Sequence, residues 1–136
     1  MTHPCFTFHI AIFQHILPFA AKYDLRIVLV NRRDYPGSSP YSEQDLALVQ
    51  KDKDADSVRS FYRARGEEFA TFMSWLIDNG SIPPISADGK KGGVALLAWS
   101  AGNAYTIPIL AYVDEFPVAT REKLEPYFRK LILFGE

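Results

Sequence analysis

The sequence predicts an α/β fold in which a parallel sheet of about three strands is flanked by helices. Short apolar runs at 25–31, 94–98 and 130–134 have the aliphatic composition of strands that are buried on both faces of such a sheet. Stretches between these runs carry apolar residues at helical spacing. Strands that alternate with helices in this way are typical of a parallel sheet with helices on both faces.

The first predicted helix covers residues 8–21, where Ile10 and Leu17 belong to one apolar stripe. Pro18 lies inside this helix and should kink or shorten it, because proline has no N–H to donate. The apolar residues at 6–12 also alternate as in a strand, so the first turn is open to both interpretations.

The first predicted strand, 25–31, is followed by a loop at 32–40 that is rich in proline, glycine and serine. Residues 41–55 are polar and are expected to continue this loop. Asp56 is the expected N-cap of a long amphipathic helix, which ends at the Asn79-Gly80 pair.

The second predicted strand, 94–98, leads into a helix over 102–114 that contains Pro108. A short polar-faced helix over 120–128 and the apolar strand 130–134 complete the predicted order. No internal repeat and no low-complexity tract interrupts it.

The composition indicates one globular domain with no electrostatic preference for nucleic acid or an anionic membrane. The 136 residues are 48% hydrophobic and carry a formal net charge of −1. The single cysteine excludes an intrachain disulfide and favours a cytoplasmic location, and no apolar run is long enough to span a membrane. Because the sequence has neither a glycine-rich dinucleotide motif nor a metal-ligand spacing, no cofactor and no metal are expected.

One stretch carries a specific chemical signal, Ala98-Trp99-Ser100-Ala101-Gly102, between a predicted strand and a predicted helix. The pattern small-x-Ser-x-Gly in this context is typical of a nucleophile elbow, a turn so tight that its serine adopts a strained backbone conformation. The residues two before and two after the serine must then be small, because they approach each other. Ser100 is the expected nucleophile, and the N–H of Ala101 is an expected donor to an oxyanion.

With these residues the chain resembles the α/β-hydrolase fold superfamily, and most of all its fungal AB hydrolase-1 domain members. The elbow carries the first part of the resemblance. The loop after the first predicted strand carries the second, because Arg33 and Ser38 fall on an arginine and a serine that the family often has there. Asn31, Asp34 and Pro36 depart from the family's pattern in the same loop.

The resemblance implies that residues 1–136 form a single truncated domain, a partial α/β-hydrolase fold with the family's strands 4 to 6 and their flanking helices. A complete domain of this class has roughly 200–250 residues, so the chain is expected to be a fragment. The strand that separates strands 4 and 5 in the family is not matched, which would leave unpaired strand edges. Three outcomes are open. The two strands pair directly with each other, residues 4–8 take the place of the missing strand, or the isolated piece is unstable.

A serine nucleophile needs a base that accepts its proton, usually a histidine held by a carboxylate. In the resembled family the order along the chain is serine, acid, histidine. Here His3, His9 and His15 all precede Ser100. This order is the strongest objection to activity of the chain alone, since base and acid would have to come from sequence outside it.

The resemblance points to further candidate residues. His3 falls where the resemblance places the histidine of the family's His-Gly motif, with Pro4 in place of the glycine, and the N–H of Cys5 is then the candidate second oxyanion donor. Glu136 follows the last predicted strand, where some family members carry the acid, although an exposed carboxylate without a role is the plainer interpretation. Arg33 and Asp34 follow the end of a predicted strand and are expected to have a structural role in their loop.

Two functions are compatible with these observations. The first is a serine hydrolase of the ester or thioester class, which acts on a small-molecule acyl substrate through Ser100. The second is a catalytically inactive remnant of a hydrolase that serves as a binding scaffold. The sequence indicates neither the identity of the substrate nor the oligomeric state.

Overall fold

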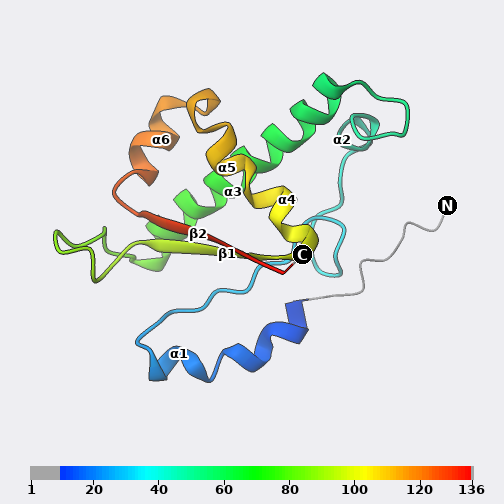
Figure 1. Ribbon diagram of the computed structural model, residues 1–136. Helices are drawn as coiled ribbons and strands as arrows, with labels where there is room; N and C mark the ends of the chain where they lie inside the picture. Colours follow the sequence, from blue (N-terminus) through cyan, green and yellow to red (C-terminus); the bar gives the residue numbers. More distant parts are fainter. Residues whose placement is uncertain (1–9, 136) are drawn as a thin grey trace. The chain divides into compact units, whose positions relative to one another are not determined.

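The longest element of the computed structural model is the 26-residue helix α3 (Ala55–Gly80), within a structure that describes residues 10–135 (Figure 1). This helix belongs to the second of two units into which the chain divides, residues 1–47 and residues 48–136. The second unit combines helices with a sheet of two parallel strands, so the chain is a mixed α/β protein.

The described part of the first unit contains the 3₁₀ helix η1 (Ile10–Ile16), followed by the single α-helical turn α1 (Phe19–Lys22). Pro18 lies between them and interrupts the predicted helix as expected, because its ring nitrogen cannot donate a hydrogen bond. The first residues of that predicted helix lie outside the described part of the chain.

Residues 25–30 differ from the prediction, because they have no strand assignment in the described structure. A strand exists only where its N–H and C=O groups pair with a neighbour, and no other strand occurs among the described residues of the first unit. Val28 and Val30 are accordingly exposed. The apolar composition of this segment favours a strand, but a strand also needs a neighbour to pair with, which the composition does not specify.

A short helix, α2 (Glu43–Ala47), occupies part of the stretch that was predicted as a loop. Its start has a reciprocal capping arrangement, in which Asp45 N–H donates to Ser42 Oγ at 3.0 Å and Ser42 Oγ donates to Asp45 Oδ2 at 2.7 Å. The signal for this helix was present as a serine followed three residues later by a carboxylate.

The N-cap of α3 is Asp54, two residues before the predicted Asp56. Asp54 Oδ1 accepts a hydrogen bond from Ser57 N–H at 2.7 Å, and this bond lowers the pKa of the Asp54 carboxyl. At the other end the helix stops at Gly80, as predicted, and Ser81 follows in the left-handed conformation with φ of 50°.

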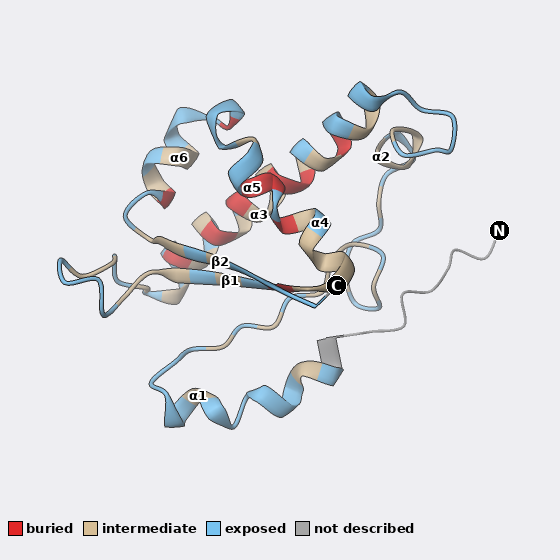
Figure 2. Cartoon of the chain, viewed as in Figure 1, coloured by how far each residue is buried: buried red, intermediate tan, exposed pale blue. Residues whose placement is uncertain are grey.

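The core of the second unit forms where α3 contacts the helical segments between residues 108 and 124, and Figure 2 shows buried residues along α3. Ala70 and Met73 of α3 pack with Ile109, Phe116 and Leu124. These residues come from segments far apart in the sequence, so their packing joins α3 to the helical segments that follow β1.

The helix predicted over 102–114 is broken into shorter pieces. The 3₁₀ helix η2 (Ser100–Gly102) leads into α4 (Asn103–Thr106), and α5 (Pro108–Ala111) and the 3₁₀ helix η3 (Val113–Glu115) follow. The break before α5 falls at its first residue, Pro108, which has no N–H to continue the ladder.

Gly66 of α3 and Pro108 of α5 are in close contact. A Cβ atom on Gly66 would lie 2.8 Å from the carbonyl carbon and oxygen of Pro108 and 2.9 Å from its Cβ. The glycine in mid-helix, which is unfavourable by propensity alone, therefore permits the two helix backbones to approach each other.

The sheet consists of β1 (Val94–Trp99) and β2 (Phe128–Phe134), which pair in parallel from Val94 opposite Phe128 to Trp99 opposite Phe134. The connection between them contains α4, α5 and α6 (Val118–Leu124), as expected for a parallel pair. β2 begins two residues before the prediction, and α6 is shorter than the predicted helix.

Only one face of this sheet has the buried character that was predicted for both faces. Val94 and Leu96 pack against the core and Ala98 is buried, whereas Leu97 and Phe134 are 55% and 64% exposed. Two strands with helices on one side leave the opposite face uncovered within the unit, and this corrects the expectation of strands covered on both faces.

We expect Gly66→Ala to destabilise the protein, by about 1–3 kcal/mol, because the added methyl group overlaps the Pro108 backbone. Helix propensity alone would predict a gain of about 1 kcal/mol. Urea unfolding monitored by circular dichroism measures the change, with Ser60→Ala on the exposed side of α3 as the control for propensity. A stabilised Gly66→Ala variant would contradict the close contact.

We expect Asp54→Ala to lower the thermal midpoint at neutral pH, because the N–H of Ser57 loses its acceptor. The folded carboxyl has a lowered pKa, so its stabilisation is complete above the unfolded value of about 3.9 and is lost as the pH falls through the folded value. The difference in thermal midpoint between Asp54→Ala and the wild type should therefore become smaller at acidic pH. Asp54→Asn retains a capping oxygen without a titrating group, and its stability relative to Asp54→Ala should not change over that range.

Candidate active site at the turn after β1

The chain reverses direction sharply at Ser100, directly after β1. Trp99 is still extended, with φ of −121° and ψ of 134°, whereas Ser100 has φ of 51° and begins η2. The left-handed region costs a non-glycine residue about 1–2 kcal/mol. The predicted strand, strained serine and helix therefore occur in the described structure in the predicted order.

The residues two before and two after Ser100 lie against each other, as expected for this turn. A Cβ atom built on Gly102 would be 3.9 Å from the Cβ atom of Ala98, which is itself buried. That distance is ordinary van der Waals contact, so a methyl group fits at position 102. The two small residues of the motif are therefore close neighbours in the structure.

The end of β2 packs on this turn. Gly135 has φ of 75°, and a Cβ atom there would lie 2.8 Å from the indole of Trp99 and 3.7 Å from the backbone nitrogen of Ser100. Asn103 Nδ2 donates a hydrogen bond to the carbonyl oxygen of Gly135 at 3.3 Å. The carboxyl ends of both strands therefore meet at the turn, which is the edge where parallel sheets bind ligands.

Asn103 was not singled out from the sequence, although it joins the two strand ends. Its Oδ1 atom is buried and receives no hydrogen bond within the described residues, while its Nδ2 holds Gly135. A lone asparagine in the first turn of a helix gives no signal of such a role, because asparagine is common near helix starts. Only the pairing of β1 with β2 brings Asn103 to Gly135.

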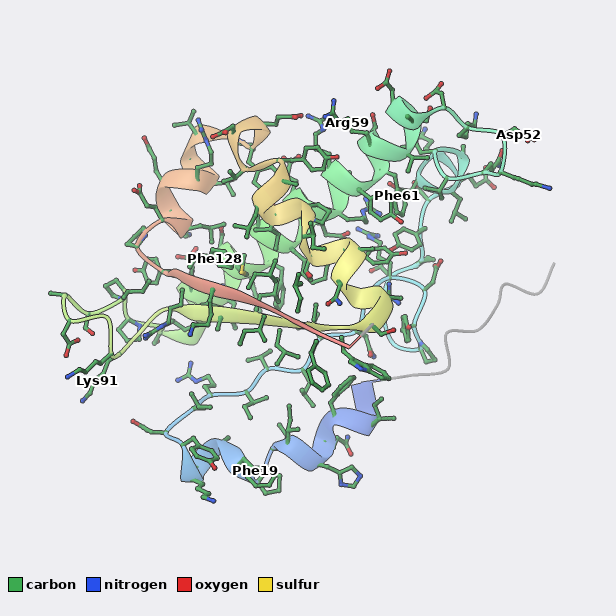
Figure 3. All side chains as sticks on the ribbon, in the orientation of Figure 1. Phe19, Asp52, Arg59, Phe61, Lys91 and Phe128 are labelled. Atoms are coloured by element: carbon green, nitrogen blue, oxygen red, sulfur yellow. The ribbon has the colours of Figure 1, made fainter. Side chains whose placement is uncertain are left out.

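The helix after the turn is docked on α3 by aromatic side chains, which Figure 3 draws with Phe61 labelled. Tyr105 of α4 contacts Phe61 and Tyr62 of α3 edge to face, with ring centroids 6.3 Å and 5.9 Å apart. Thr106 is buried, and its hydroxyl donates to the carbonyl oxygen of Asn103 at 3.3 Å. Tyr105 therefore belongs to an aromatic cluster that joins α4 to α3.

Ala101 follows Ser100 in the first turn of η2, where backbone N–H groups have no acceptor within the helix. Such a group is suited to stabilise negative charge on an oxygen near the serine. The other predicted oxyanion donor, Cys5, and the candidate acid, Glu136, lie outside the described residues, as do His3 and His9.

The loop after the predicted first strand closes on itself. Asp34 has φ of 65°, and its Oδ1 atom accepts a hydrogen bond from Tyr41 N–H at 2.9 Å. Arg33 donates to the carbonyl oxygen of Pro40 at 3.1 Å, and Arg32 donates to the hydroxyl of Tyr35 at 2.9 Å. Arg33 and Asp34 thus have the structural role in the loop that the sequence analysis favoured.

The carboxyl groups with a lowered pKa have local structural causes. The Ser86 hydroxyl and the Lys90 N–H both donate to Asp88, and the Ser86 bond is the main reason that the pKa of Asp88 is lowered. The lowered pKa of Asp54 belongs to the start of α3. Neither group lies in the turn at Ser100, so neither shift indicates a catalytic acid there.

Residues 10–135 contain no three-ligand metal cluster and no membrane-spanning helix. No group of three or more His, Cys, Asp or Glu residues in this part of the chain could hold a metal ion. No helix in the same part is long and apolar enough to cross a membrane.

Comparisons with family models, with curated proteins and with solved structures each find no match to this chain. The geometry of the turn is therefore what supports a site at Ser100.

We expect Ser100→Gly to raise the free energy of unfolding by about 1 kcal/mol, because glycine adopts a positive φ without the steric cost that serine has. Ser81→Gly is the matched control, since Ser81 has φ of 50° and should give a similar gain. Ser100→Ala keeps the Cβ atom and should leave stability nearly unchanged. A loss of stability in Ser100→Gly, measured by urea unfolding, would contradict the strained turn.

Proposed function

We propose that Ser100 is the nucleophile of a serine hydrolase of the ester or thioester class, related to the α/β-hydrolase superfamily. The observation that supports this proposal most is the positive φ of Ser100 between a parallel strand and a helix. A strained serine at the carboxyl end of a parallel strand is the arrangement that presents a hydroxyl above a sheet edge. The contact of Ala98 with Gly102 adds independent support.

In the proposed reaction the Ser100 hydroxyl oxygen attacks the acyl carbon and its proton passes to a base. The N–H of Ala101 stabilises the oxyanion that forms, and the N–H of Cys5 is the proposed second donor. Collapse of the intermediate expels the alcohol or thiol and leaves an acyl-enzyme, which water hydrolyses. Asn103 keeps the end of β2 against the turn through its bond to Gly135, so it helps to position the serine.

The base and the acid of this reaction come from outside residues 10–135 in this proposal. Every histidine of the sequence precedes Ser100, and His15 is the one histidine in the described range. Glu136, which follows β2, is the proposed acid within the chain. Without a base a serine hydroxyl is a poor nucleophile, so the chain alone is expected to acylate slowly.

The fold that we propose to accompany this function is a partial α/β-hydrolase fold. β1 and β2 would correspond to the family's strands 5 and 6, whereas residues 25–31, which the resemblance matched to its strand 4, have no strand assignment. The parallel pairing of β1 with β2 and the helical connection between them support that correspondence.

A catalytically inactive, hydrolase-derived binding scaffold is the second candidate. The position of all three histidines before Ser100 favours it, because the family's order places the base after the serine.

We expect the chain to be labelled by a fluorophosphonate probe at Ser100, slowly in the absence of a base, and Ser100→Ala to abolish that labelling. Ser81→Ala, which removes the other described serine with a positive φ, should be labelled like wild type. Mass spectrometry of the modified peptide identifies the site. Labelling that survives Ser100→Ala would remove the assignment, and no labelling of the wild type would favour the scaffold.

A further inference from the structure

The second unit contains a groove of about 450 Å³ between α5, η3, α6 and the first residue of β2. Its volume lies in the range of small-molecule sites. Ile109 and Phe116 are buried at its base, whereas Leu110, Val113 and Val118 are 52%, 38% and 57% exposed. Three exposed aliphatic side chains surround one groove. Removing them from water by contact with an apolar chain would be favourable.

The groove is separate from the turn at Ser100. Phe128, the residue of β2 that lines it, is paired with Val94 at the start of β1, and Ser100 follows the end of β1. Because the strands are parallel, the groove and the turn lie at opposite ends of the sheet. Figure 3 labels Phe128 at its end of the sheet.

Three charged side chains line the groove, Arg121, Glu122 and Glu125. The two glutamates are three residues apart and therefore lie on the same side of α6 and the turn that ends it. Within the described residues neither has an ion-pair partner. The Arg121 guanidinium pairs with Asp114 at 3.6 Å, although its Nε atom is buried and finds no acceptor in that part of the chain.

We propose that this groove binds an alkylammonium ligand, with its aliphatic chain against Leu110, Val113 and Val118 and its cationic head beside Glu122 and Glu125. Two carboxylates without a cation next to an apolar surface complement a ligand that has both properties. A carboxylate ligand would meet the two glutamates, and its only favourable contact would be Arg121, whose charge Asp114 already offsets. The site requires no role for Ser100.

The test compares three ligands of equal chain length, octylammonium, octanol and octanoate, by amide chemical-shift titration of the full chain at neutral pH. We expect saturable shifts confined to residues 109–128, with octylammonium binding most tightly and octanoate most weakly. Added salt should weaken octylammonium binding and leave octanol unchanged, because only the former involves charge.

The matched variants are Glu122→Gln with Glu125→Gln, and Glu67→Gln as a control carboxylate outside the groove. The double variant should reduce the affinity for octylammonium by about three- to ten-fold, the effect of two exposed charge contacts, and leave the affinity for octanol unchanged. Glu67→Gln should leave the affinities for octylammonium and for octanol unchanged. Val113→Ser should weaken all three ligands, because it removes part of the apolar wall.

Tighter binding of octanoate than of octylammonium would overturn the proposal and assign the groove to anions through Arg121. Equal binding of octylammonium to wild type and to the double variant would also overturn it, as would shifts outside residues 109–128.

Discussion

The contact between Gly66 and Pro108 is the constraint on which the second unit depends. Because residue 66 has no side chain, α3 can approach the backbone of α5, and the proline fixes where α5 begins. That approach brings Met73 into contact with Ile109 and Phe116 in one buried cluster. A two-stranded sheet cannot build a core by itself, so its stability depends on the helices that this contact holds in place.

The turn at Ser100 depends on the same arrangement. On one side Tyr105 anchors the following helix to α3, and on the other Gly135 packs on Trp99. A non-glycine residue keeps a positive φ only where its surroundings hold it there. The positive φ of Ser100 is thus maintained by packing on both sides of the turn.

The sheet presents two different surfaces. Leu96 faces the core, whereas Leu97 and Phe134 are exposed, so the alternation along the strands separates a packed face from an apolar uncovered one. Apolar surface recurs at Val113 and Val118, where two glutamates accompany it. The second unit thus exposes apolar side chains at more than one place.

The sequence by itself determined the local features. The strand before Ser100, the strained serine, the interruption at Pro18 and the end of α3 at Gly80 each follow from a few neighbouring residues, and each occurs in the structure. The tertiary structure alone decided which strands exist and what lies beside the serine. Residues 25–30 have strand composition without strand structure, and Asn103 reaches Gly135 across 32 positions of sequence. The physical reason is that a turn, a cap or a proline break is set by local sterics, whereas strand pairing and helix packing depend on partners that no short stretch of sequence specifies.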